Sequence, residues 1–235
     1  MESEKLRRQL TVLLAFGSVL VSARALAHVE VQSGTAPSNA TSEVVFAVGH
    51  GCSGNDTLKV VVDIPAGVTG VRPMRSDFAN PTVQKDPAGT ITSVTWQKPV
   101  AEALDSDALF YRLSIRLKTP DQPLTTVYFP VHQTCRAANG DLTTVDWIDI
   151  PPSTATGNPA AALKLVPARM PGWNKFTVPV AMTDLSVFFK DASIVWKGTA
   201  SAYSANPHIA LLITNTSGVT SLTSLNAGDE VWVKY

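Results

Sequence analysis

The run Leu58-Lys59-Val60-Val61-Val62-Asp63-Ile64, closed by Pro65-Ala66-Gly67, decides the fold class of this 235-residue chain. Its valines and isoleucine are β-branched, and such residues are enriched in strands. Proline with a nearby glycine is typical of a turn. A short apolar run bounded by turn residues predicts a buried β-strand.

Similar segments lie on both sides of this run. Turn residues such as Asp86-Pro87-Ala88-Gly89 separate them, and Asn139-Gly140 is a tight-turn pair between two of them. No convincing helix lies between these segments. Several short strands at fairly regular spacing predict a β-sandwich or barrel. The predicted strands are 43–48, 58–64, 90–96, 109–117, 126–131 and 144–150.

The composition changes after the last of these strands. Residues 151–171 contain five prolines among alanines and small polar residues, which predicts an ordered but irregular connection. Beyond it, the patterns predict a strand hairpin around Lys190-Asp191 over 185–198 and a short helix over 208–214. Pro207 fits the start of that helix. With predicted strands at 220–225 and 230–235, we interpret residues 172–235 as a small C-terminal module, α+β or β-rich.

The N-terminus has the three parts of a secretory signal peptide. A polar start with three basic residues is followed by an apolar run over 10–21 and then by Ala25-Leu26-Ala27, a small-x-small cleavage signal. The apolar run is shorter than the ~20 residues that span a bilayer. We therefore expect residues 1–27 to be removed on export, so that the mature chain begins at His28 and meets the membrane only through its leader.

The charges of the chain are balanced. Of its 19 basic and 19 acidic residues, four and two lie in 1–27, so the chain from His28 has 15 and 17 and a formal charge of minus two. This balance gives no electrostatic footprint for nucleic acid or an anionic membrane. The sequence also contains no nucleophile elbow, phosphate-binding glycine loop or His-Glu-x-x-His motif, so we do not expect an enzyme.

The two cysteines allow two interpretations. An even pair in an exported chain, Cys52 and Cys135, predicts a disulfide. The sharper alternative is a zinc or copper site, because His50 and His132 lie close to them in sequence. Export into an oxidising compartment and the absence of zinc-finger spacing favour the disulfide.

A histidine at the mature N-terminus can act as a chelating ligand for a metal ion. Its freed α-amine and its imidazole Nδ1 can bind one metal ion together. The pKa of an α-amine is ~7.7, so its deprotonation costs little free energy at neutral pH. Nitrogen donors favour Cu(II). The plainer alternative is that export merely leaves His28 first. Glu30 would point to the same side of a strand and could ligate copper directly or through water, although a solvated strand residue is the simpler interpretation.

Several motifs resemble the YcnI-like domain of bacterial copper proteins, over about residues 28–166. The Gly-Cys and Gln-Thr-Cys segments are similar to the Gram-negative branch, and 188–191 and 227–235 resemble a C-terminal extension of some members. The motifs are His28-Val29-Glu30-Val31, His50-Gly51-Cys52-Ser53-Gly54, 62–68, 91–96, 128–131 and Trp147-Ile148-Asp149-Ile150-Pro151.

The resemblance implies a mainly β fold, a cupredoxin-like or immunoglobulin-like β-sandwich. It also implies Cu(II) as the cofactor, held by His28 in a monohistidine brace, with Trp147 close to the metal. An indole there could shield the ion, contact it or tune its redox behaviour. From the residues alone, a half-buried strand aromatic is the favoured interpretation of Trp147. Arg75-Ser76-Asp77-Phe78 replaces the Pro-Gly-Trp of many relatives, so no role is carried over to that loop.

We therefore expect a periplasmic copper-binding protein that acts in copper acquisition, delivery or buffering, with copper chaperones or copper-transport membrane proteins as partners. A metal-free envelope protein is the first alternative. A copper monooxygenase is the second; it would need a second histidine, such as His50 or His132, and no polysaccharide-binding aromatic surface is visible in the sequence. The other four tryptophans, 96, 173, 196 and 232, are expected in cores or interfaces.

Overall fold

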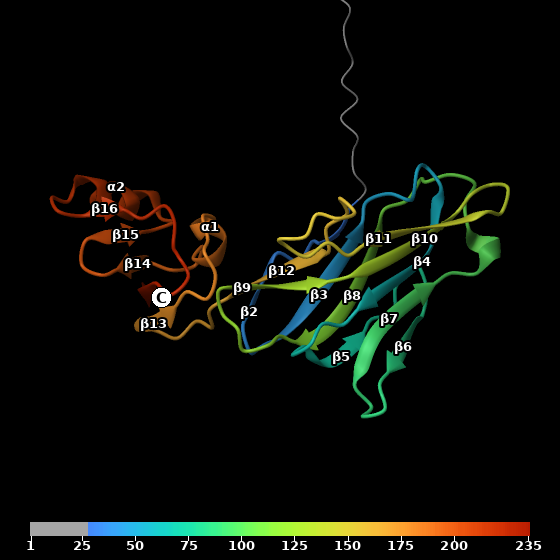
Figure 1. Ribbon diagram of the computed structural model, residues 1–235, viewed down its shortest axis with the longest axis horizontal. Coiled ribbons are helices and arrows are strands. Elements are labelled where there is room, and N and C mark those ends of the chain that lie inside the picture. Colours follow the sequence, from blue (N-terminus) through green and yellow to red (C-terminus); the bar gives the residue numbers. More distant parts are fainter. Residues whose placement is uncertain (1–27) are drawn as a thin grey trace, which may run out of the picture.

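The computed structural model describes residues 28–235, so the predicted signal peptide lies outside the described residues. Figure 1 shows a β-sandwich beside a smaller C-terminal part, the two arranged along the long axis of the molecule. Each part has its own cluster of buried hydrophobic side chains. No helix between residues 28 and 235 is both long enough and apolar enough to span a bilayer.

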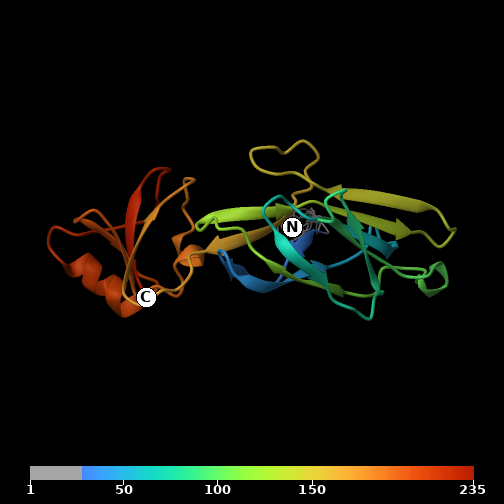
Figure 2. The ribbon, with the colours of Figure 1, turned by 90° about the horizontal axis from the view of Figure 1, so that it is seen from below.

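Two sheets face each other across the core of the sandwich (Figures 1 and 2). The first has the order β1 (Val29–Val31), β3 (Thr41–Val48), β8 (Tyr111–Lys118), β5 (Thr69–Pro73). The second has the order β11 (Leu142–Trp147), β10 (Val131–Arg136), β4 (Asp56–Asp63), β7 (Ile91–Gln97), β6 (Pro81–Lys85). Alternate side chains of both sheets, such as Phe46 and Val60, are fully buried between them. The prediction of a mainly β, immunoglobulin-like sandwich is confirmed.

A third sheet corrects one prediction. It has the order β2 (Thr35–Pro37), β12 (Ala161–Val166), β9 (Thr125–Phe129), and β12 lies inside the segment predicted to be irregular. Ala161, Leu163 and Leu165 alternate along β12 and are almost completely buried. This period-two pattern outweighs the prolines, because they flank the strand and do not interrupt its ladder.

The Asn139-Gly140 turn and the disulfide are both present. Gly140 has a φ of 94° and its N–H donates to the Ala137 carbonyl oxygen at 2.9 Å, closing the hairpin of β10 and β11. Cys52 and Cys135 form a disulfide with a Cα–Cα distance of 5.7 Å across a sequence separation of 83. The alternative metal site built on these cysteines is wrong, because both sulfurs are bonded to each other. Closing a loop of this length stabilises the fold by about 4 kcal/mol in the chain-entropy model.

The C-terminal part, residues 172–235, is a sheet with two helices. Its strands have the order β13 (Trp173–Thr177), β17 (Glu230–Lys234), β14 (Ile194–Lys197), β15 (Ser201–Tyr203), β16 (Thr220–Ser221). The predicted helix is present as α2 (Pro207–Asn215), where the side chain of Asn206 caps the His208 N–H at 2.9 Å. The predicted strand over 220–225 is shortened to the two residues of β16.

The predicted hairpin over 185–198 is wrong in its first half. That half forms α1 (Leu185–Phe188), because Leu185, Phe188 and Phe189 are buried at helical spacing in the second core. Only β14 remains a strand, and it pairs with β17 and β15.

The two parts are joined by more than the chain connection. Leu124, just before β9 of the sandwich, is 1% exposed and packs into the core of the C-terminal part. Its φ is 64°, a left-handed conformation that is uncommon for a leucine. Lys164 of β12 also pairs with Asp184 at 2.8 Å. A side chain of one part therefore belongs to the core of the other.

A buried ion pair fixes the segment 98–111, which contains the short 3-10 helix η1 (Val100–Glu102). Asp56 is fully buried, and its carboxylate accepts hydrogen bonds from Lys98 Nζ, the Tyr111 hydroxyl at 2.8 Å and the Leu104 N–H at 2.7 Å. Burial by itself lowers the pKa of Lys98, but the hydrogen bonds and the Asp56 charge outweigh it, so that the pKa of Lys98 is raised. Lys98 is thus charged, and its Nζ also donates to the Tyr111 hydroxyl at 3.0 Å.

We expect Lys98→Met to destabilise the protein by about 3–5 kcal/mol, because it leaves the Asp56 carboxylate charged, buried and without its cation. Urea unfolding followed by circular dichroism measures the loss. Lys85→Met on exposed β6 is the control and should change stability by less than about 0.5 kcal/mol. Equal stability of the two variants would contradict this role of Lys98.

Candidate metal-binding site

His28 and Trp147 lie next to each other. His28 directly precedes β1, at the edge of the first sheet, and Trp147 ends β11, at the edge of the second. Their ring centroids are 5.4 Å apart, with the ring planes tilted by 35°. The fold thus brings together two of the three residues predicted for the metal site.

A buried amide holds the indole of Trp147 in place. Trp147 is 4% exposed, and its Nε1 donates to Gln133 Oε1 at 3.1 Å. Gln133 Nε2 in turn donates to the His50 carbonyl oxygen at 2.9 Å and to Thr57 Oγ1 at 2.8 Å. Trp147 also packs in the core of the sandwich. It is therefore both a core residue and the ring that contacts His28.

Gln133 is not among the predicted site residues, although the sequence contains a signal for it. Gln133 lies on β10 between Val131 and Cys135, and alternate residues of a strand point to the same face. A polar residue at a buried position of this kind needs hydrogen-bond partners inside the protein. The pattern could therefore have predicted a buried amide network beside the disulfide.

The third predicted residue, Glu30, is exposed on β1, opposite Ala47. Within residues 28–235, its carboxylate takes part in no hydrogen bond or ion pair with another side chain. The same range contains no group of three or more His, Cys, Asp or Glu side chains that could hold a metal. A ligand role for Glu30 stays a prediction.

His132 does not join His28. Its strand neighbours Val131 and Gln133 are buried, so the half-buried ring of His132 lies on the outer face of the second sheet, away from Trp147. There Nδ1 is 2.6 Å from Asp146 Oδ1 and Nε2 is 3.3 Å from Asp63 Oδ2. Burial by itself lowers the pKa of His132, but the two carboxylates outweigh it and raise this pKa.

His50 supports Trp147 through its main chain. Its carbonyl oxygen accepts the hydrogen bond from Gln133, while its ring Nδ1 is 3.0 Å from the Gly51 carbonyl oxygen. The ring Nε2 is buried and has no hydrogen-bond partner. The sequence placed His50 at the end of a strand beside the disulfide, and it follows β3 and precedes Cys52 by two residues.

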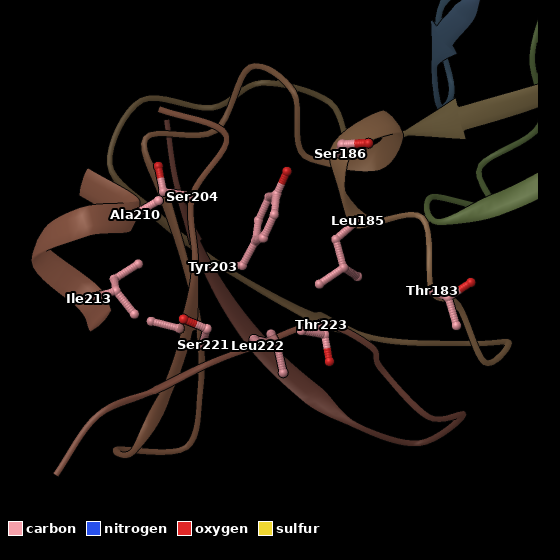
Figure 3. Close-up of a pocket in the computed structure, with 11 residues that line it drawn as sticks. Thr183, Leu185, Ser186, Tyr203, Ser204, Ala210, Ile213, Ser221, Leu222 and Thr223 are labelled. Carbon is pink, nitrogen blue, oxygen red and sulfur yellow. The ribbon is translucent and has the colours of Figure 1, made fainter. Parts of the chain in front are cut away.

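A separate hollow of about 360 Å³ lies in the C-terminal part (Figure 3). Figure 3 shows Tyr203 of β15 projecting between Leu185 of α1 and Ala210 of α2. Burial, together with the charge of Asp184, raises the pKa of Tyr203. None of its lining residues belongs to the sandwich, so this hollow is distinct from the His28 site.

Comparison with known proteins assigns the sandwich to a family. Residues 28–165 match the model of a domain of unknown function, DUF1775. The chain belongs to the DUF1775 family. YcnI-like domains belong to this family, so the predicted membership is confirmed.

The DUF1775 chain is also similar to a crystal structure of an uncharacterised protein from Nocardia farcinica, described as having an immunoglobulin-like fold. The two are 25% identical, the match covers 59% of this chain and 98% of that one, and the TM-score is 0.48. No curated protein matches the chain.

His132 should make the stability of this DUF1775 protein depend on pH. Because its pKa is raised in the folded state, its protonated form stabilises the fold below the ordinary pKa of ~6.5, and this contribution is lost as the pH rises through the folded-state pKa. The difference in urea midpoint between the wild type and His132→Gln should therefore be larger at pH 6 than at pH 9. His208→Gln, at the start of α2, is the control. A difference for His132→Gln that stays constant over this range would rule out the contribution.

Proposed function

We propose that this protein, once residues 1–27 are removed, binds one Cu(II) ion at His28. The contact between the His28 and Trp147 rings, with centroids 5.4 Å apart, carries the proposal. It joins the residue that cleavage after Ala27 would turn into a chelating N-terminus to an indole that is hydrogen-bonded to Gln133. Membership of the DUF1775 family, to which YcnI-like domains belong, supports the same function.

The proposed ligands are the freed α-amine and the imidazole of His28. The two nitrogens close a chelate ring on one ion, and a tetragonal arrangement dominated by nitrogen suits Cu(II). Water, or the carboxylate of Glu30 two residues further along the chain, would complete the coordination. Trp147 lies beside the His28 ring, where its indole would shield a bound ion from solvent.

The proposed role is copper acquisition, delivery or buffering in the periplasm. A chelate of one histidine at the end of the chain leaves positions on the ion open to an incoming donor, which suits transfer to a copper chaperone or a copper-transport membrane protein. His132 lies on the far face of the second sheet with both nitrogens beside carboxylates, so it offers no second histidine for a monooxygenase-type brace.

The first test is a Cu(II) titration of protein whose intact mass shows that it begins at His28. We expect about one ion per chain, with a tetragonal, nitrogen-dominated electron paramagnetic resonance spectrum. Acetylation of the His28 α-amine should weaken binding by at least about 100-fold, because the amine becomes an amide and loses its basic lone pair. His28→Ala should weaken it at least as much.

Matched variants separate the proposed site from its alternatives. Trp147→Phe keeps most of the ring volume and should change affinity by no more than about tenfold, with an altered spectrum and an intact fold. His208→Ala is the histidine control and should bind as the wild type does. Equal affinity of the mature and the N-terminally acetylated forms would defeat the proposal. Loss of binding in His50→Ala equal to that in His28→Ala would replace the monohistidine site by a two-histidine one.

A further inference from the structure

Three tryptophans from the C-terminal part gather on one face of its sheet. Trp173 and Trp232 are 51% and 46% exposed, Trp196 is half-buried, and together they line a hollow of about 430 Å³. The sequence predicted cores or interfaces for these residues and showed no aromatic surface, because they come from three separate segments. Trp96, by contrast, is fully buried in the sandwich, as predicted.

The strand register explains how the indoles meet. Trp232 of β17 lies directly opposite Trp196 of β14 on one side and Lys175 of β13 on the other. Trp173 lies two residues further along β13, diagonal to Trp232, which is within reach of aromatic side chains. Trp232 is therefore the centre of the group.

The tryptophans stand on strands whose opposite face is buried. The residues that alternate with the tryptophans, Val195, Val231 and Val233, are fully buried in the core on the opposite side of the sheet. The strand pairing therefore fixes the spacing of the backbone positions that carry the three indoles. Exposed apolar patches with a polar rim mark binding sites, and this shallow, open hollow suits a ligand that lies flat on the indoles.

The charges around the tryptophans limit what can bind. Lys175 is neutralised by Glu230 at 2.7 Å. Lys234 lies opposite Trp173 with its Nζ 5.9 Å from the ring centroid, and among residues 28–235 it has no carboxylate within 4 Å. The ammonium group of Lys234 would repel a cationic ligand, so the face suits a neutral or acidic ligand with an apolar side.

We propose that this face binds carbohydrate, with pyranose rings stacked on Trp232 and its two neighbours. A pyranose has a flat C–H side that packs on an indole, and its edge carries hydroxyl groups that can accept hydrogen bonds from Lys234 Nζ. Acidic sugars would gain a charge interaction with the same ammonium group. The tryptophan face belongs to the C-terminal part, and the proposal is independent of copper binding at His28.

The test uses the full chain from residue 28. Co-sedimentation with cellulose, chitin and peptidoglycan sacculi, followed by titration with chitohexaose or cellohexaose under tryptophan fluorescence, measures binding. We expect binding to at least one of these glycans, and Trp232→Ala should weaken it by at least about tenfold, as for a central interface tryptophan. Trp232→Phe should retain part of the affinity. Leu212→Ala, also exposed but on α2, should bind as the wild type does.

Circular dichroism shows whether each variant is folded, and Cu(II) titration of Trp232→Ala should be unchanged. Absence of binding to all of these glycans would overturn the proposal, as would equal binding by Trp232→Ala. Dimerisation in analytical ultracentrifugation that disappears in Trp232→Ala, without glycan binding, would assign the face to a second copy of the chain. Binding only to anionic phospholipid vesicles would assign it to a membrane.

Discussion

The buried amide of Gln133 is the interaction on which the proposed site depends. A primary amide without hydrogen-bond partners in a core costs about 1–3 kcal/mol, so its three hydrogen bonds to Trp147, His50 and Thr57 act as one unit. They connect strands β11 and β4 with the segment that follows β3, all at a single point. The Cys52–Cys135 disulfide lies beside this point and restrains the same segments covalently. The indole that contacts His28 is therefore positioned by the core of the sandwich and not by a surface loop.

Much of the sandwich could be predicted from the sequence because its strands alternate and its turns use glycine, proline and asparagine. The errors lie where a local signal was outweighed by packing. Prolines around β12 concealed a buried alternating strand, and the apolar residues after Leu185 concealed a short helix whose large side chains fill the second core. Neither segment has a strand partner close to it in sequence that would have revealed how it packs.

The site could be predicted only in part, for a related reason. The chemistry of His28 follows from its expected position at a cleaved N-terminus, whereas the pairing with Trp147 came from the family resemblance and not from the residues. Contacts between segments far apart in sequence depend on register, which composition does not reveal. Gln133 had a local signal in its buried strand position, but the tryptophan face had none, since Trp173, Trp196 and Trp232 meet only through β17.

Leu124 restricts how the sandwich and the C-terminal part can move relative to each other. Its side chain extends from the sandwich into the core of the C-terminal part, and the Lys164–Asp184 pair lies near the same junction. A swivelling motion of one part against the other would have to withdraw a leucine from an apolar interior into water, at about 1.5–3 kcal/mol. The junction consequently disfavours such a rotation, and a ligand bound on the tryptophan face would spend most of its time in one orientation toward the His28 end of the sandwich.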